Sequence, residues 1–139
     1  MNNLMVNTGV VTYKLNDACE VVFNPTDIAF AEKICNVFEM LEKKQTEKNA
    51  STGQLSEPKQ IFELARSYDK EMRALIDDIF GISICDALFG NMNIYALANG
   101  LPLWCNLLLA IMDEINDHVI KEQTLVNPRI AKYLEKYKS

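Results

Sequence analysis

Apolar and polar residues alternate near the start of the chain, which is the pattern of a β-strand whose two faces differ. The apolar positions of this alternation are Val11, Tyr13, Leu15, Val21 and Phe23. A period of two on either side of the polar pair Asn16 and Asp17 predicts a β-hairpin over about residues 9–24. Two strands alone are only marginally stable in water, so we expect the hairpin to pack on the rest of the protein or to pair with another chain.

The apolar spacing changes to three and four after residue 24, which predicts an α-helix. We expect this helix to begin at Pro25 and Thr26, with Asn24 or Thr26 as its cap. Its apolar stripe consists of Ile28, Ala31, Ile34, Cys35, Phe38 and Leu41. Residues 49–56 contain turn formers and no apolar period, so they predict a mobile linker to the next helix.

A second helix is predicted from Ser56, its expected cap, to Gly81, where a left-handed residue would end it. Its apolar positions are Ile61, Phe62, Ala65, Tyr68, Met72, Leu75, Ile76, Ile79 and Phe80. A short helix is expected over residues 84–89, followed by another short turn over residues 94–97. A longer helix is predicted from Pro102 to about residues 118–121.

The last segment begins at Asn127 and Pro128 and alternates apolar with basic residues, which predicts a short basic amphipathic helix. Together these patterns predict a mainly α fold, a small helical bundle of about four to six helices with an N-terminal β-hairpin. We expect one domain over residues 1–139, because the length suits a single core. Its parts are the hairpin at about 9–24, a helical body at about 25–122 and the basic helix at about 127–138.

Composition and charge restrict the classes of partner. With 49% apolar and 24% charged residues the chain has the make-up of a globular protein. Its net charge of −5 disfavours broad contact with nucleic acid or anionic lipid, whose phosphates need positive charge opposite them. The most apolar stretch, residues 101–112, is shorter than the roughly 20 residues of a membrane span. Residues 1–9 have neither the basic start nor the long apolar run of a secretion signal.

The four cysteines are spaced too far apart for a zinc knuckle or a redox pair. Cys35, Cys85 and Cys105 have apolar neighbours, so we expect buried thiols that act as small hydrophobic side chains. A chain of this size needs no disulfide framework, and we infer a reducing compartment.

Reactive groups are few, and no enzyme, cofactor or metal is expected. The only histidine, His118, lies near the end of a helix without a nucleophile signature beside it. The acidic residues grouped on the helices are Asp77, Asp78, Asp113, Glu114 and Asp117. A solvated helix face explains them, although an antiparallel arrangement of the two helices would leave open a Mg²⁺ or Ca²⁺ site. The glycines lie between helical segments and form no phosphate-binding loop.

Two segments are candidates for binding a protein partner. Leu101, Leu103, Trp104 and Leu108 belong to the strongest apolar concentration, which forms either core or a groove for an amphipathic helix. The groove alternative would use Met72, Met92 and Met112 as adaptable lining. In the basic segment, the residues that would dock to an acidic groove are Arg129, Lys132, Tyr133 and Lys136.

Five stretches resemble small tail-region proteins of phages and prophages from Gram-positive bacteria. They are residues 23–34, 72–81, 85–90, 93–102 and 127–133. Such proteins are similar to the tail assembly chaperones of long-tailed phages. The resemblance implies a small helical protein in the cytoplasm of the bacterial host, which binds the apolar tape-measure protein or the tail-tube protein. It implies no catalytic residue.

Two other functions stay open. One is a phage-encoded inhibitor of a bacterial defence protein, although the acidic residues here are interleaved with Lys and Arg. The other is a structural tail-completion component, and a stable ring in solution would favour this alternative. A homo-oligomer is compatible with each of these. A metal-dependent enzyme using Asp77 or Asp113 is the most remote alternative.

Overall fold

The computed structural model describes residues 1–124, 129 and 132. Over these residues the chain forms four helices and two small antiparallel sheets. The elements in chain order are β1 (Val11–Leu15), β2 (Cys19–Phe23), α1 (Ile28–Thr52), α2 (Pro58–Phe80), α3 (Ile84–Phe89), β3 (Leu97–Ala98), β4 (Leu101–Pro102) and α4 (Leu103–Thr124). The predicted mainly α fold with an N-terminal hairpin is therefore confirmed.

The N-terminal hairpin has the predicted alternation. Strands β1 and β2 pair from Val11 opposite Phe23 to Leu15 opposite Cys19. Asn16 and Asp17 form the turn with φ of 51° and 56°, a left-handed conformation that short polar side chains tolerate. Val21 and Phe23 lie on the buried face, so the hairpin packs on the helical body as expected.

Helices α1 and α2 form a long antiparallel pair whose ends differ from the prediction. Helix α1 is capped by Asp27, which accepts a hydrogen bond from the Ala29 N–H at 2.9 Å. Asn24 instead accepts the Thr26 N–H at 2.8 Å and closes a turn before the helix. The cap prediction was wrong because the tight turn that starts at Asn24 moves the helix start two residues along.

The first half of the expected linker, residues 49–52, is helical. Helix α1 continues to Thr52, and a turn of five residues leads into α2 at Pro58. Helical backbone here satisfies the N–H and C=O groups internally, and an antiparallel helix pair needs only a short loop. The cap of α2 is Glu57 instead of Ser56, and it makes no side-chain capping bond.

Helix α2 ends at the predicted glycine. Gly81 is left-handed, with φ of 70°, and its N–H donates to the Asp77 carbonyl oxygen at 2.9 Å. Helix α3 follows as predicted. The expected short turn lies at residues 94–95, and the segment from 97 to 102 after it forms a second hairpin that we did not predict. Asn99 and Gly100 have φ of 56° and 77°, the pair most favoured at a two-residue hairpin turn.

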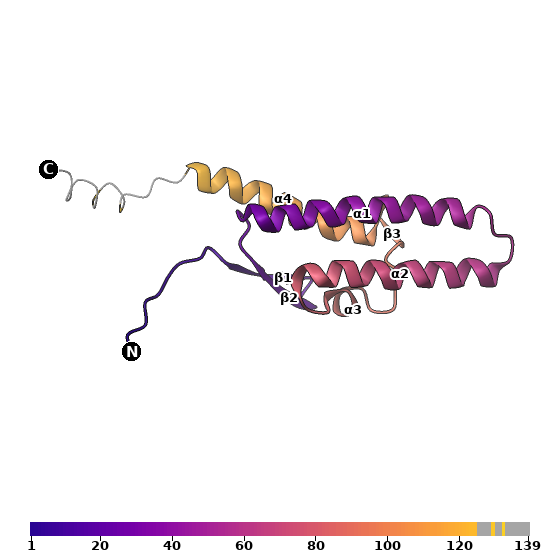
Figure 1. Ribbon diagram of the computed structural model, residues 1–139, viewed down its shortest axis with the longest axis horizontal. Coiled ribbons are helices and arrows are strands. Elements are labelled where there is room, and N and C mark those ends of the chain that lie inside the picture. Colours follow the sequence, from indigo (N-terminus) through magenta and orange to yellow (C-terminus); the bar gives the residue numbers. More distant parts are fainter. Residues whose placement is uncertain (125–128, 130–131, 133–139) are drawn as a thin grey trace.

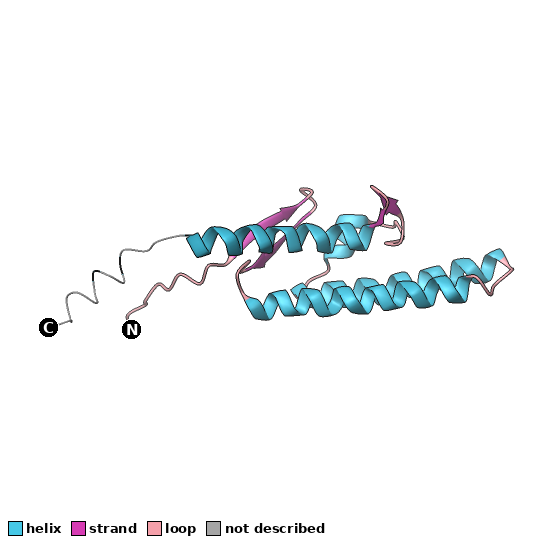
Figure 2. Ribbon diagram, turned by 90° about the horizontal axis from the view of Figure 1, so that it is seen from above, coloured by secondary structure: helices cyan, strands magenta, loops and turns pink. Residues whose placement is uncertain are grey.

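The helices lie nearly parallel to one long axis. Figure 1 shows α1 and α2 side by side with α4 along α1, while β1, β2 and α3 cover the α2 end. Figure 2, seen from above, places α4 and the hairpin on one side of the α1–α2 pair. One cluster of buried side chains joins β2 with all four helices. Aromatic rings lie inside it, with Phe23 and Phe30 stacked at 4.5 Å between centroids.

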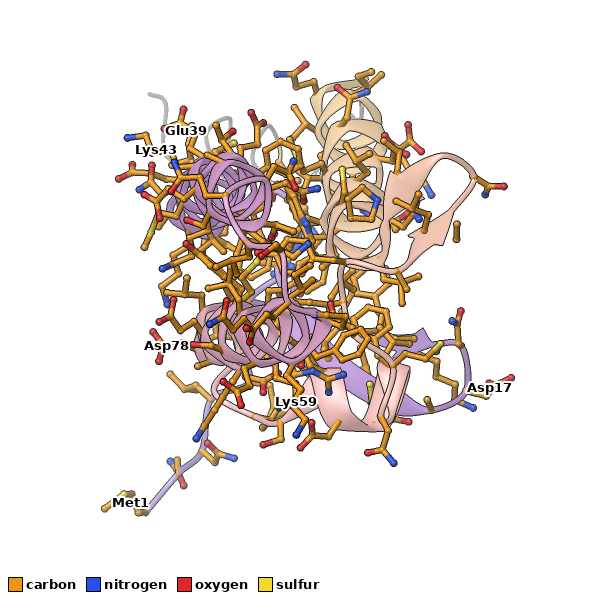
Figure 3. All side chains as sticks on the ribbon, turned by 90° about the vertical axis from the view of Figure 1, so that its right-hand side faces the viewer. Met1, Asp17, Glu39, Lys43, Lys59 and Asp78 are labelled. Carbon is orange, nitrogen blue, oxygen red and sulfur yellow. The ribbon has the colours of Figure 1, made fainter. Side chains whose placement is uncertain are left out.

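Three apolar positions of the predicted helical stripes are on the surface. Phe62 of α2 is 61% exposed. Ile28 is 84% exposed because it occupies the first turn of α1. Cys35 is exposed because it lies one residue, or about 100° of helix rotation, beyond the buried Ile34. Cys85 and Cys105 are buried as predicted. In Figure 3 side chains fill the space between the helices, and the labelled Glu39, Lys43, Lys59 and Asp78 point away from it.

Candidate partner-binding site

Two of the predicted contact residues belong to the core. Trp104 is 3% exposed, and its Nε1–H donates to Oε1 of Gln45 at 2.8 Å. Its ring meets that of Phe38 edge-on at 5.4 Å. Leu108 is completely buried. Neither side chain can meet a partner in this conformation, so the core interpretation of these two residues is the one that the structure shows.

The other two predicted apolar residues lie at the surface beside them. Leu101 is exposed in β4, and Leu103 is half-buried at the start of α4. The Asn106 side-chain amide donates to the carbonyl oxygens of Ala98 and Leu101, at 2.9 and 3.4 Å. These bonds tie the small β3–β4 hairpin to the first turn of α4, so the position of Leu101 is fixed relative to the helix.

A cleft of about 490 Å³ opens next to these residues. Its walls come from the tip of the β1–β2 hairpin, the end of α3, the β3–β4 turn and the first two turns of α4. The lining residues are Lys14, Leu15, Asn16, Leu88, Phe89, Ala98, Asn99, Leu103, Asn106, Leu107 and Ala110. We call this the hairpin cleft. Lys14 is its only charged residue, and most of the others are apolar, which suits an apolar ligand more than a charged one.

A network of polar contacts holds the loop that carries one wall of the cleft. The Arg73 guanidinium donates to Asp69 at 3.0 Å, to Asp86 at 2.8 Å and to the Met92 carbonyl oxygen. Asp69 also accepts the Ile94 N–H at 2.7 Å. Arg73 is only 12% exposed, so these bonds form in a region of reduced screening. They anchor the chain between α3 and β3 to α2.

Two of the five acidic residues that could have bound a metal, Asp77 and Glu114, make contacts within the protein. Asp77 accepts the backbone N–H groups of Ile84 and Cys85, each at 3.0 Å. It therefore caps α3 from the end of α2. Glu114 pairs with His118 at 3.0 Å one turn along α4. In the part of the chain that the structure describes, no group of three His, Cys, Asp or Glu residues is placed to hold a metal ion.

The buried thiols are poorly suited to nucleophilic chemistry. Burial raises the pKa of Cys85 strongly, and the nearby Asp77 carboxylate raises it further. Burial also raises the pKa values of Cys19 and Cys105. Because the thiolate is the reactive form, these three groups are not activated at neutral pH.

The remaining predicted site residues are spread over the molecule. Met72 is buried, Met112 is half-buried and Met92 is 54% exposed, so the three do not line one groove. Arg129 and Lys132 have helical backbone and exposed side chains. Tyr133 and Lys136 lie outside the described residues. The sequence analysis did not identify the cleft residues that β1 and α3 contribute. The two turns that border the cleft contain Asn16 and Asn99, and such turn residues can be recognised in a sequence.

Comparison with known proteins finds no match: no family model, no curated protein and no solved structure is significantly similar to this chain. None of the helices within residues 1–124 has the length and apolarity needed to cross a membrane.

Proposed function

We propose that this protein acts without catalysis, by holding an apolar helical segment of another protein in the hairpin cleft. The observation that carries the proposal is the cleft itself, which is open to solvent and whose lining includes the apolar residues Leu88, Phe89 and Leu107. A helix offers a row of apolar side chains at i, i+3 and i+4, which suits such a depression.

The resemblance to tail assembly chaperones gives this activity a biological setting. The partner in that setting is the tape-measure protein, or else the tail-tube protein, in the cytoplasm of a bacterial host. Tape-measure helices are apolar and need cover until tube subunits surround them. The net charge of −5 supports this role, because it keeps a complex of chaperone and apolar client soluble. The same charge disfavours nucleic acid as the ligand.

A charged side chain placed in the cleft tests the proposal without disturbing the core. Ala110 is exposed on α4 and lines the cleft, so Ala110→Glu puts a carboxylate against an apolar ligand. Ala74→Glu is the matched control, because Ala74 is an exposed helical alanine on α2 and lies outside the cleft lining. Both positions have acidic residues within one helical turn, so the repulsion within each helix is similar.

The experiment measures soluble tape-measure protein after coexpression, and its affinity for purified chaperone. We expect the wild type and Ala74→Glu to keep the tape measure soluble, and Ala110→Glu to bind it at least about tenfold more weakly. A wild type that neither binds the tape measure nor changes its solubility refutes the chaperone function. Equal binding by the two variants refutes the cleft as the site.

A further inference from the structure

The α1–α2 pair has one face that no other helix or strand of the described residues covers, and we call it the open face. Figure 3 looks along the helices and shows α4, α3 and both hairpins on the same side of the pair. The labelled Asp78 points out from the other side. A pair of helices buries one face in the core of its own domain, so apolar residues on a second face need a separate explanation.

A groove of about 630 Å³ lies between the two helices on the open face. Its lining residues are Met40, Lys44, Glu71, Ala74, Leu75 and Asp78. Three of these are apolar: Met40 is 44% exposed, Ala74 is exposed and Leu75 is half-buried. The acidic residues Glu71 and Asp78 are about 10 Å apart along α2, so the apolar residues lie between them.

An ion pair joins the two helices at one end of the groove. Nζ of Lys44 on α1 lies 2.9 Å from Oε2 of Glu71 on α2, so the two residues stand at the same height along the pair. The Glu71 side chain is 54% exposed, whereas that of Lys44 is 27% exposed. Because a carboxylate has two acceptor oxygens, Glu71 can also accept a hydrogen bond from a second ammonium group in solvent.

We propose that two copies of this chain dimerise through their open faces and form an antiparallel four-helix bundle. The two-fold axis runs parallel to the helices, so that α1 of each copy packs on α2 of the other. Lys44 of each copy then lies opposite Glu71 of the other, at the height that the ion pair sets. Four residues further along, Met40 lies opposite Leu75 of the second copy. The four charges alternate in sign, and the apolar residues come together between the copies.

Charge favours this axis over the other symmetrical arrangement. A two-fold axis across the helices at the middle of the groove would place α2 on α2 with reversed direction. Glu71 of each copy would then meet Asp78 of the other, and like charges brought together across an interface oppose association. The axis along the helices instead creates two pairs of opposite charge. The open face is therefore complementary to itself, which is what an interface between identical copies requires.

The helices are long enough for a specific interface. Helices α1 and α2 have 25 and 23 residues, and 23 residues of helix extend about 35 Å. A face two helices wide measures about 20 Å across, so each copy offers a footprint of about 700 Å². Specific interfaces of standard size bury about 800 Å² per partner. The open face lies on the other side of the α1–α2 pair from the hairpin cleft, so this inference is independent of the proposed function.

The mass of the full chain in solution is the first test. By sedimentation at about 100 µM we expect twice the chain mass of 15.8 kDa. Ala74→Glu places a carboxylate in the middle of the open face and should weaken dimerisation at least about tenfold. Ala110→Glu is the control, because Ala110 lines the hairpin cleft, and this variant should dimerise normally. A monomeric wild type, or an Ala74→Glu variant that dimerises as the wild type does, overturns the proposal.

These two variants also keep the two proposals apart. Ala74→Glu is expected to lose the dimer and keep the client, whereas Ala110→Glu is expected to keep the dimer and lose the client. A dimer that binds no tape-measure protein therefore contradicts only the proposed function. A monomer that binds it contradicts only the bundle.

Charge exchange tests the pairing between copies. Lys44→Glu and Glu71→Lys each place like charges opposite each other, so each variant alone should dimerise at least about tenfold more weakly than the wild type. An equimolar mixture of the two should form heterodimers, because opposite charges then face each other between unlike copies. Both variants lack the ion pair within the chain, so only contacts between copies explain this recovery. A mixture that stays monomeric contradicts the bundle, and so does a Glu71→Lys variant that dimerises more tightly than the wild type, as the axis across the helices requires.

Discussion

Replacing Asp77 by alanine is expected to destabilise the protein much more than replacing its neighbour Asp78. Asp77 lies in the last turn of α2, where the dipole of that helix disfavours a negative charge. Its carboxylate instead accepts two N–H groups at the start of α3, from Ile84 and Cys85. Both residues are completely buried, so water cannot replace the lost acceptor.

The magnitude follows from these two bonds. A hydrogen bond to a charged group contributes roughly 1.5–3 kcal/mol, and leaving a buried donor unsatisfied costs a similar amount. Removing the Asp77 carboxylate also removes its unfavourable interaction with the dipole of α2, which offsets part of this loss of stability. We therefore expect Asp77→Ala to lower the free energy of unfolding by about 2–4 kcal/mol, and the melting temperature by about 8–15 °C. Asp77→Asn keeps an acceptor oxygen, so its cost should be about half as large.

Urea unfolding, followed by far-ultraviolet circular dichroism and by the fluorescence of the single tryptophan, measures the loss. Asp78→Ala is the control. Asp78 is exposed, and its carboxylate makes no hydrogen bond within the described residues, so its replacement should change stability by less than about 0.5 kcal/mol. If Asp77→Ala and Asp78→Ala unfold at the same urea concentration, the carboxylate of Asp77 does not hold α3, and this explanation of the acidic pair is wrong.

Three further perturbations test other parts of the fold. Trp104→Phe removes the hydrogen bond to Gln45 and should lower the free energy of unfolding, measured in urea, by about 1–3 kcal/mol. A decrease of less than about 0.5 kcal/mol would show that this bond does not stabilise the fold. Gly81→Ala should cost about 1–2 kcal/mol because of its positive φ, whereas Gly53→Ala, in right-handed helical backbone, should be neutral or stabilising by up to about 1 kcal/mol. Equal effects at the two glycines would contradict the left-handed end of α2. Burial, aided by the Glu114 carboxylate, raises the pKa of Tyr13 to about 12 from 10.0 in the unfolded chain. The contribution of Tyr13 to stability should therefore be constant below pH 10 and fall as the pH rises from 10 to about 12, and Tyr13→Phe should remove this part of the total loss at high pH. Urea midpoints at pH 8 and 11 for the wild type and the variant measure that difference.

Local sequence patterns predicted the elements themselves well. The alternation from Val11 to Phe23 and the polar pair between the strands were enough for the hairpin, because side chains on a strand alternate faces. The three-four spacing before Gly81 was enough for α2, and the glycine marked its end. Helix ends were less predictable. The chain after residue 49 has weak local preferences, and packing beside α2 extends α1 to Thr52.

The candidate site was only partly visible in the sequence. Leu101, Leu103, Trp104 and Leu108 were named together as candidates for a groove or for the core. In the structure Leu101 and Leu103 lie at the surface, whereas Trp104 and Leu108 face the core because side chains rotate by about 100° per residue along α4. The other walls of the hairpin cleft come from residues 14–16 and 88–89, which are far away in sequence. No pattern within one element indicates that a hairpin tip and the end of a short helix will meet.

The amino-acid sequence by itself determined the mainly helical class, the hairpin, the acidic charge and the identity of most core residues. These properties depend on neighbours along the chain, through the periods of two and 3.6 and through glycine and asparagine at the turns. The tertiary structure decided that Asp77 caps a second helix and that four separate segments enclose a cleft. It also decided that Gly9 takes a left-handed conformation against the side chain of Asn24. Those outcomes depend on which distant backbone and side-chain groups come within contact distance, and only the packed chain brings them together.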